Sequence, residues 1–258
     1  MPHLNQLWND FAPKGLHIFH VESQGHTEEQ VREFCEKNNV VFPQVMSSDA
    51  DFSNFPGGSG LPYAYLIGVD GKVIWQGRDG YKAIIHEEIK KVRFPGLGRL
   101  TVAKSLEKAA ALFGQGRFDK AHELAAKELA EEGVAADVAA DAKYIQERVA
   151  LRGQRVEKRA RDAETEREYD AAITAWSEIA ASFKALPLGE TAKTELERLK
   201  GDATAKKERR ASAAYADVLK KIERMADRQR AADLLKAFAE QFEGTKAAEK
   251  ALKKAKHG

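Results

Sequence analysis

The sequence predicts an α/β domain over residues 1–94 followed by an all-α domain over residues 95–258. Six of the seven prolines lie at or before Pro95, and Gly96 and Gly98 follow it directly, which is typical of a domain boundary. Short β-like runs alternate with helical patterns before this point, whereas Ala, Glu, Lys, Arg and Leu dominate after it. The latter composition is helical. A chain of 258 residues is long enough for two such domains.

The first domain begins with a predicted helix over residues 2–11. Its apolar side chains share one face: Leu4, Leu7, Trp8 and Phe11. A short strand is expected over residues 16–21. Thr27 then opens a second helix, because Gln30 follows three residues later in the pattern of a capping box. The apolar face of this helix is predicted to hold Val31, Phe34 and Cys35.

The rest of the first domain is predicted as an extended segment, a loop, a hairpin and a helix: residues 40–43, 49–59, 63–67 with 73–76, and 81–92. Asp70 and Gly71 form the two-residue signal of a hairpin turn. The last helix is expected to bury Ile85, Ile89 and Val92. The predicted order is therefore helix, strand, helix, proline-containing loop, hairpin and helix.

This order, with its motifs, resembles the TlpA-like, redoxin-type proteins of the thioredoxin superfamily. The resemblance covers residues 1–92. It is carried by residues 1–5, 15–21, 42–43 and 60–77, which include Gly-Leu-Pro and Asp-Gly-Lys motifs. The combination in this order is more specific than any single motif. It implies a thioredoxin-like fold and the activity of a thiol–disulfide oxidoreductase.

The chain departs from that family at the residues that perform the chemistry. It has one cysteine, Cys35, and no Cys-x-x-Cys. In the family, the cysteine pair opens the helix that here begins the chain, and a central strand precedes it. The resemblance therefore implies an incomplete domain, in which the missing central strand leaves the apolar edges of strands 16–21 and 63–67 unpaired. Such edges are unfavourable, because buried backbone groups need hydrogen-bond partners. Two explanations stay open: Met1 belongs to a longer reading frame or a truncated form, or the domain is naturally shortened and redox-inactive.

The resemblance implies a substrate-docking site rather than a catalytic one in this chain. Pro62 matches the family's cis-proline, and Gly60 and Leu61 precede it. X-Pro bonds adopt the cis form at modest cost, so a cis Pro62 is expected on the resemblance, and an ordinary trans proline before a strand is the alternative. No catalytic residue is assigned, because both cysteines of the pair are missing.

The remaining chemically active residues favour structural roles. Cys35 lies on a predicted apolar face, where a thiol behaves as a small hydrophobe and has a raised pKa. A lone nucleophile is the less favoured alternative. His17 and His20 are three apart on a predicted strand and point to opposite faces. The other histidines lack ligand spacing. The sequence predicts no metal site and no cofactor.

The second domain carries a weak internal repeat. Residues 116–121 resemble residues 167–172, and residues 183–199 resemble residues 242–252. The pattern predicts divergent tetratricopeptide-like helical hairpins, which bury their faces against neighbours and commonly present a surface to protein partners. A helical scaffold without a ligand is the alternative. A long helix is expected across residues 137–168.

Charge and hydropathy exclude several classes of function. The chain has 42 basic and 40 acidic residues, so it lacks the basic excess of a nucleic-acid-binding domain. No apolar run is long enough to span a membrane, and no signal peptide opens the chain. The family implies the bacterial periplasm or cell envelope if an upstream segment exists, and the cytoplasm otherwise.

The sequence therefore predicts a protein of the thioredoxin-like oxidoreductase family that is redox-inactive in this chain and carries a helical protein-interaction domain. Its expected partners are proteins, with disulfide-bearing substrates for an intact version. Two alternatives remain: a redox-inactive thioredoxin-like binding module, or a scaffold whose activity resides in the helical repeats.

Overall fold

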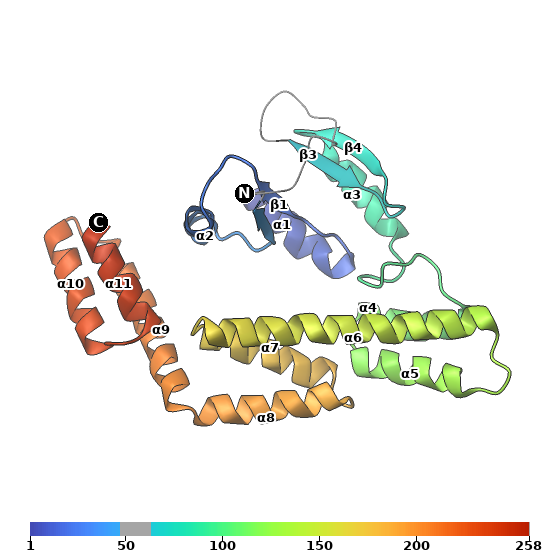
Figure 1. Cartoon of the computed structure of the whole chain (residues 1–258). Helices are drawn as coiled ribbons and strands as arrows, with labels where there is room; N and C mark the ends of the chain where they lie inside the picture. The colour runs from blue at the N-terminus through green and yellow to red at the C-terminus, as the bar shows by residue number, and fades with distance from the viewer. Residues whose placement is uncertain (47–62, 258) are drawn as a thin grey trace. The chain divides into compact units, whose positions relative to one another are not determined.

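The computed structural model describes residues 1–46 and 63–257 (Figure 1). The chain forms two compact units. The first contains residues 1–115 and 128–142, and the second contains residues 116–127 and those from 143 onward. The domain boundary at residues 94 and 95 stays a prediction.

The two predicted helices at the start of the first unit are confirmed. α1 spans Pro2–Phe11 and continues into a 3-10 turn, η1, at Ala12–Lys14. α2 spans Glu28–Lys37 and begins with the predicted capping box. The Thr27 hydroxyl accepts from the Gln30 amide at 3.3 Å, and the Gln30 side chain accepts from the Thr27 amide at 2.8 Å. These two bonds satisfy donors that the helix leaves without an internal partner.

The strands form two separate two-stranded sheets. β1 (His20–Glu22) pairs in parallel with β2 (Gln44–Met46), and His20 lies opposite Gln44. β3 (Ala64–Ile67) and β4 (Val73–Gly77) form the predicted antiparallel hairpin. Within the described residues, β1 pairs only with β2 and β3 only with β4. This arrangement is consistent with a partial thioredoxin-like domain.

The strand predicted over residues 16–21 is wrong in its bounds, because β1 begins only at His20. The parallel partner β2 is three residues long and pairs with residues 20–22. Residues 16–19 therefore have no ladder partner in the part of the chain that the structure describes. β2 itself was not predicted, since three residues after Pro43 are too few to show an alternating pattern.

The core of this region lies between α1 and α3 (Tyr81–Glu88). Leu7 and Phe11 pack with Ile85, and side chains from the segment before β1 and from β3 pack against them: Leu16, Ile18 and Leu66. The predicted helix over residues 81–92 is shorter than expected. It tightens into a 3-10 turn, η3, at Ile89–Lys91, where the Val92 amide donates to the Ile89 carbonyl at 3.2 Å. Ile85 is buried, and Ile89 and Val92 are half-buried.

The segment after this helix is packed rather than exposed. Phe94 and Leu97 are buried, and a Cβ on Gly96 would lie 3.7 Å from the Phe113 ring. Phe113 belongs to α4 (Glu107–Gly114), which follows a 3-10 turn, η4, at Lys104–Leu106. Asp141 fixes the intervening chain, because its carboxylate accepts from the Ala103 amide at 2.7 Å.

All the regular secondary structure described in the second unit is α-helical (Figure 1). Two helices contribute residues to both units, α5 (Phe118–Ala130) and α6 (Ala136–Thr165), and α6 confirms the predicted long helix. The others are α7 (Tyr169–Ser182), α8 (Pro187–Gly201), α9 (Ala203–Ile222), α10 (Arg228–Gln241) and α11 (Lys246–His257). α7 pairs with α8, and α10 pairs with α11.

The connections next to several of these helices match in geometry. Gly116 and Arg167 each lie two residues before a helix, and both have left-handed backbones, with φ of +74° and +59°. Phe183 and Phe242 end α7 and α10 with φ/ψ of −118°/25° and −115°/33°. These equivalences support the predicted internal repeat. The tetratricopeptide-like assignment stays a prediction.

The α7–α8 hairpin depends on a small residue in the first turn of α8. A Cβ on Gly189 would lie 2.3 Å from the Phe183 carbonyl oxygen, a distance that only movement of the backbone could relieve. Glycine therefore permits the close approach of α8 to the end of α7. The ring of Phe183 is buried there and lies 4.9 Å from the ring of Phe118.

Candidate functional site

The predicted docking residues Gly60, Leu61 and Pro62 lie outside the described residues. The chain is described again from Tyr63, at the start of the β3–β4 hairpin, where aromatic side chains gather. Tyr63 and Tyr65 meet edge to face at 5.3 Å, as do Trp75 and Tyr81. The Tyr81 hydroxyl lies 2.9 Å from the His3 Nε2, which connects the beginnings of α1 and α3.

Burial shifts the ionisation of both polar groups in this cluster. The pKa of His3 is lowered, first by burial and then by the positive chain terminus. The pKa of Tyr81 is raised by burial and then by Asp79. At neutral pH both groups therefore favour their neutral forms. A neutral imidazole and a phenol can exchange a hydrogen bond but supply no charge for catalysis.

Cys35 lies on α2 and is half-buried. Burial, followed by the neighbouring Glu36 carboxylate, raises the pKa of its thiol. Because the thiolate is the nucleophile in disulfide exchange, this shift opposes reactivity at neutral pH. The predicted apolar face of α2 is only partly present: Val31 is buried, but Phe34 is 42% exposed. The expectation that this whole face is buried is therefore wrong at Phe34.

The described histidines form no metal centre. His17 stacks near Phe19, whereas His20 Nδ1 contacts the Gln44 side chain across the β1–β2 ladder. Among residues 1–46 and 63–257, no three His, Cys, Asp or Glu side chains are grouped in a way that could hold a metal ion.

Apolar side chains are exposed along both sheets. Phe19, just before β1, is 62% exposed, and Ile67 at the end of β3 is 55% exposed. The other exposed apolar residues of the strands are Val45, Met46, Val73 and Ile74. Larger exposed apolar areas on a folded protein mark interaction surfaces or aggregation liabilities. These six residues lie on both faces of the two sheets, because successive side chains of a strand alternate, and we call them together the apolar strand surface.

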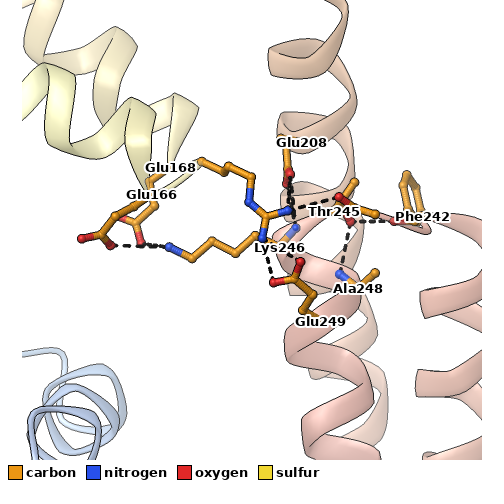
Figure 2. Close-up of polar contacts among 10 residues, drawn as sticks. Glu166, Glu168, Glu208, Phe242, Thr245, Lys246, Ala248 and Glu249 are labelled. Carbon is orange, nitrogen blue, oxygen red and sulfur yellow. Dashed lines mark hydrogen bonds and ion pairs between the residues drawn. The ribbon is translucent and has the colours of Figure 1, made fainter.

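The second unit contains a charged corner that sequence reasoning did not predict (Figure 2). Arg167, in the turn before α7, reaches α9 and α11. Its guanidinium donates to both oxygens of Glu249 at 2.7 Å and to the Gly244 carbonyl at 3.1 Å, and lies 3.4 Å from Glu208. The hydrogen bonds that Arg167 donates to Glu249 raise the pKa of the Arg167 guanidinium.

Glu208 is the buried centre of this corner, with 5% of its surface exposed. Its two oxygens lie 3.2 and 3.0 Å from the Lys246 amide at the start of α11. The Thr245 hydroxyl accepts from the Ala248 amide at 3.2 Å. Together they satisfy two of the amide donors that a helix leaves unpaired at its first turn.

The ammonium of Lys246 extends the corner toward α7 by contacting Glu168 at 2.8 Å and Glu166 at 3.6 Å (Figure 2). A cavity of about 250 Å³ adjoins these residues. Because Arg167 and Lys246 both meet carboxylates, the arrangement fastens the helices together and does not present a free cation. We call Arg167, Glu208, Lys246 and Glu249 the charged corner.

One sequence signal could have found Glu208. It interrupts the basic run at residues 206–210. It also lies at i+3 from Ala205 and i−3 from Ala211, both buried residues of α9. An acidic residue on the apolar face of a helix requires a buried partner. The partner of Glu208 is Arg167, which is 41 residues away, and nothing in the sequence around Arg167 indicates this pairing.

No helix in the described ranges is both long and apolar enough to span a membrane.

Two curated proteins are similar to part of the chain. They are the thiol-disulfide oxidoreductase ResA of Bacillus thuringiensis subsp. konkukian (strain 97-27) and that of Bacillus cereus (strain ATCC 10987 / NRS 248), each 28% identical over 93 residues. The aligned region is 36% of this chain, and it spans about half the length of each relative, 53%. No family model and no solved structure matches the chain. The similarity supports a distant thioredoxin-like relationship for about a third of the protein.

Proposed function

We propose that this chain is a thioredoxin-like protein-binding module that performs no thiol–disulfide exchange with its own residues. The observation that carries the proposal is the low reactivity expected of the Cys35 thiol. It is the only cysteine in the sequence, it is half-buried on α2, and its pKa is raised by burial. A thiol of this kind is a poor nucleophile, and no second thiol in this chain can resolve a mixed disulfide.

The binding role is supported by the apolar strand surface and by the similarity to thiol-disulfide oxidoreductases. In this proposal, Gly60, Leu61 and Pro62, which directly precede the hairpin in the sequence, dock a protein chain. Exposed apolar side chains on the adjacent strands then contribute contact area, each worth roughly 1 kcal/mol or more when buried. Strand addition at an open sheet edge is a common way to bind an extended segment.

The helical part is proposed to bind a second protein through tetratricopeptide-like hairpins, with a domain boundary near residue 95. The matching turns before α5 and α7 and at the ends of α7 and α10 support this repeat. The scaffold alternative assigns all binding to these hairpins. The two alternatives differ in which exposed apolar residues a partner needs.

The protein is expected to show no disulfide reductase activity. In an insulin-reduction assay with dithiothreitol, the rate should equal that of a control without protein. The rate should be the same for the variant Cys35→Ser, because Cys35 takes no part. Turnover above the control that disappears in Cys35→Ser would contradict the proposal and assign the activity to that thiol.

Substitution of the apolar strand surface is expected to reduce partner binding. The double variant Phe19→Asp/Ile67→Asp, used as affinity bait in extracts of the source cell, should lose at least 90% of its specific partner relative to the unaltered chain, because each Asp replaces an apolar contact by a charge that must be desolvated. The matched control is Leu252→Asp on α11, where the leucine is 45% exposed.

The pattern of loss separates the alternatives. Retention by Leu252→Asp with loss in the double variant supports binding by the strands. The reverse pattern would contradict that proposal and support a helical scaffold. Circular dichroism of each variant should match the unaltered protein, since all three positions are exposed.

A further inference from the structure

The first unit contains a second concave surface that the proposed function does not use. A groove of about 480 Å³ lies where η1, the end of α3 and η3 come together. Its volume falls within the range of roughly 300–1,000 Å³ that is usual for ligand sites. All of its lining residues belong to the first unit. We call it the basic groove.

The floor of the basic groove is apolar. Phe11 is buried beneath it, and Ile89 and Val92 are half-buried in its wall. Gly15 allows η1 to approach this wall closely: its backbone has φ of +108°, and a Cβ there would lie 2.9 Å from Val92 Cγ1. The apolar floor therefore depends on a turn that glycine permits.

The rim of the groove is basic. Its charged or titratable side chains are Lys14, His86, Lys90 and Arg93, and no Asp or Glu belongs to the lining. His86 belongs to α3, Lys90 to η3 and Arg93 to the chain after η3, and all three side chains line the groove. The rim therefore draws its positive groups from different segments of the chain: Lys14 from η1, Lys90 from η3 and Arg93 from the chain after it.

The cations of the rim are available to pair with carboxylates of a ligand. The Lys14 ammonium lies 4.8 Å from the centre of the Phe11 ring and forms no ion pair within residues 1–46 and 63–257. Lys90 pairs with Glu87 at 2.6 Å and Arg93 with Glu107 at 3.0 Å, but both pairs are exposed. Exposed pairs contribute only about 0–1 kcal/mol each, so an incoming carboxylate can replace the partner at little cost.

We propose that the basic groove binds an acidic segment of a protein partner in which acidic and apolar side chains alternate. A single small carboxylate would engage one of the cations, whereas several spaced carboxylates match all of them. Alternating apolar side chains would enter the floor over Phe11. The inference does not depend on the absence of thiol chemistry, because none of its residues belongs to that argument.

Fluorescence anisotropy with a synthetic peptide tests this proposal. The probe is a short fluorescein-labelled peptide that alternates Asp or Glu with Leu or Phe. The full chain should bind the peptide. The double variant Lys14→Glu/Lys90→Glu should bind it with an affinity at least about tenfold lower, because two attractive contacts become repulsive. The matched control is Lys37→Glu/Lys143→Glu, which makes the same change in net charge at exposed positions outside the groove.

Two further probes distinguish groove binding from general attraction. A peptide with Ser in place of Leu and Phe, and a peptide with Lys in place of the acids, should each bind at least tenfold more weakly than the alternating peptide. Equal binding of the Ser peptide, equal binding by the two double variants, or no binding of the alternating peptide would each overturn the proposal. Binding of decanoate but not of the peptide would also overturn it and would assign the groove to fatty carboxylates.

Discussion

Replacing Arg167 with alanine is expected to lower the free energy of unfolding of the helical unit by about 3 kcal/mol. The reason is the carboxylate of Glu208, whose side chain is only 6% exposed. Without Arg167 this carboxylate keeps its bonds to the Lys246 amide but loses its countercharge. An uncompensated buried charge is far more costly than a lost surface ion pair.

The control is Glu249→Ala. Glu249 accepts both short hydrogen bonds from Arg167 but is 61% exposed, so its loss should cost less than about 1 kcal/mol. Judged by distance alone, Glu249 would contribute more to stability than Glu208, because its contacts with Arg167 are shorter than the 3.4 Å contact of Glu208. Because Glu208 is buried and Glu249 is exposed, we expect Glu208 to be the partner whose pairing with Arg167 contributes more to stability.

Urea unfolding followed by circular dichroism measures both variants, and a double-mutant cycle with Glu208→Ala isolates the pair. The expected result is a large favourable coupling between positions 167 and 208. Equal losses for Arg167→Ala and Glu249→Ala would contradict the assignment of Glu208 as the buried centre. Arg167→Gly should cost less than Arg167→Ala, because glycine relieves the left-handed backbone at φ +59°.

Replacing Trp176 with alanine is expected to have the largest effect on stability, a loss of about 3–5 kcal/mol. Trp176 is fully buried on α7. Its indole donates to Glu164 at 2.8 Å, and the Arg161 guanidinium lies 5.2 Å from its ring. The substitution therefore leaves a cavity and also removes a hydrogen bond and a cation–π contact.

The matched variant is Trp176→Phe, which keeps most of the ring volume and loses the indole donor. It should cost about 1–2 kcal/mol, since Glu164 retains its ion pair with Arg198. Chemical unfolding monitored at 222 nm gives both values without relying on tryptophan fluorescence. A loss below 1 kcal/mol for Trp176→Ala would show that the α6–α7 packing around this ring does not stabilise the unit.

Much of the local structure was predictable because its signals are local. The capping box of Thr27 and Gln30, the β3–β4 hairpin and the long helix near residues 137–168 all depend on residues close in sequence, although the hairpin loop spans residues 68–72 and not the two-residue turn expected at Asp70 and Gly71. The matching turns at Gly116 and Arg167 were also visible as a weak repeat. Each of these features shows its pattern within a few turns of chain.

The errors arose where distant contacts decide the structure. β1 begins at His20 because β2 pairs with residues 20–22, and no pattern within residues 16–21 shows where its partner ends. Phe34 has helical spacing with Val31 but little to pack against. The charged corner joins residues 41 and 82 positions apart, so its parts had no shared signal. The docking residues Gly60, Leu61 and Pro62 lie outside the described residues and stay a prediction.

The apolar strand surface also affects how the protein survives in a cell. Phe19, just before β1, and Ile67, at the end of β3, are more than half exposed, and exposed apolar side chains are also what chaperones and proteases meet in unfinished chains. If a partner covers this surface, bound molecules are hidden from that surveillance and unbound molecules are not. Protein made in excess of the partner would then be degraded. The cellular level of this protein would therefore follow the level of its partner without any dedicated regulator.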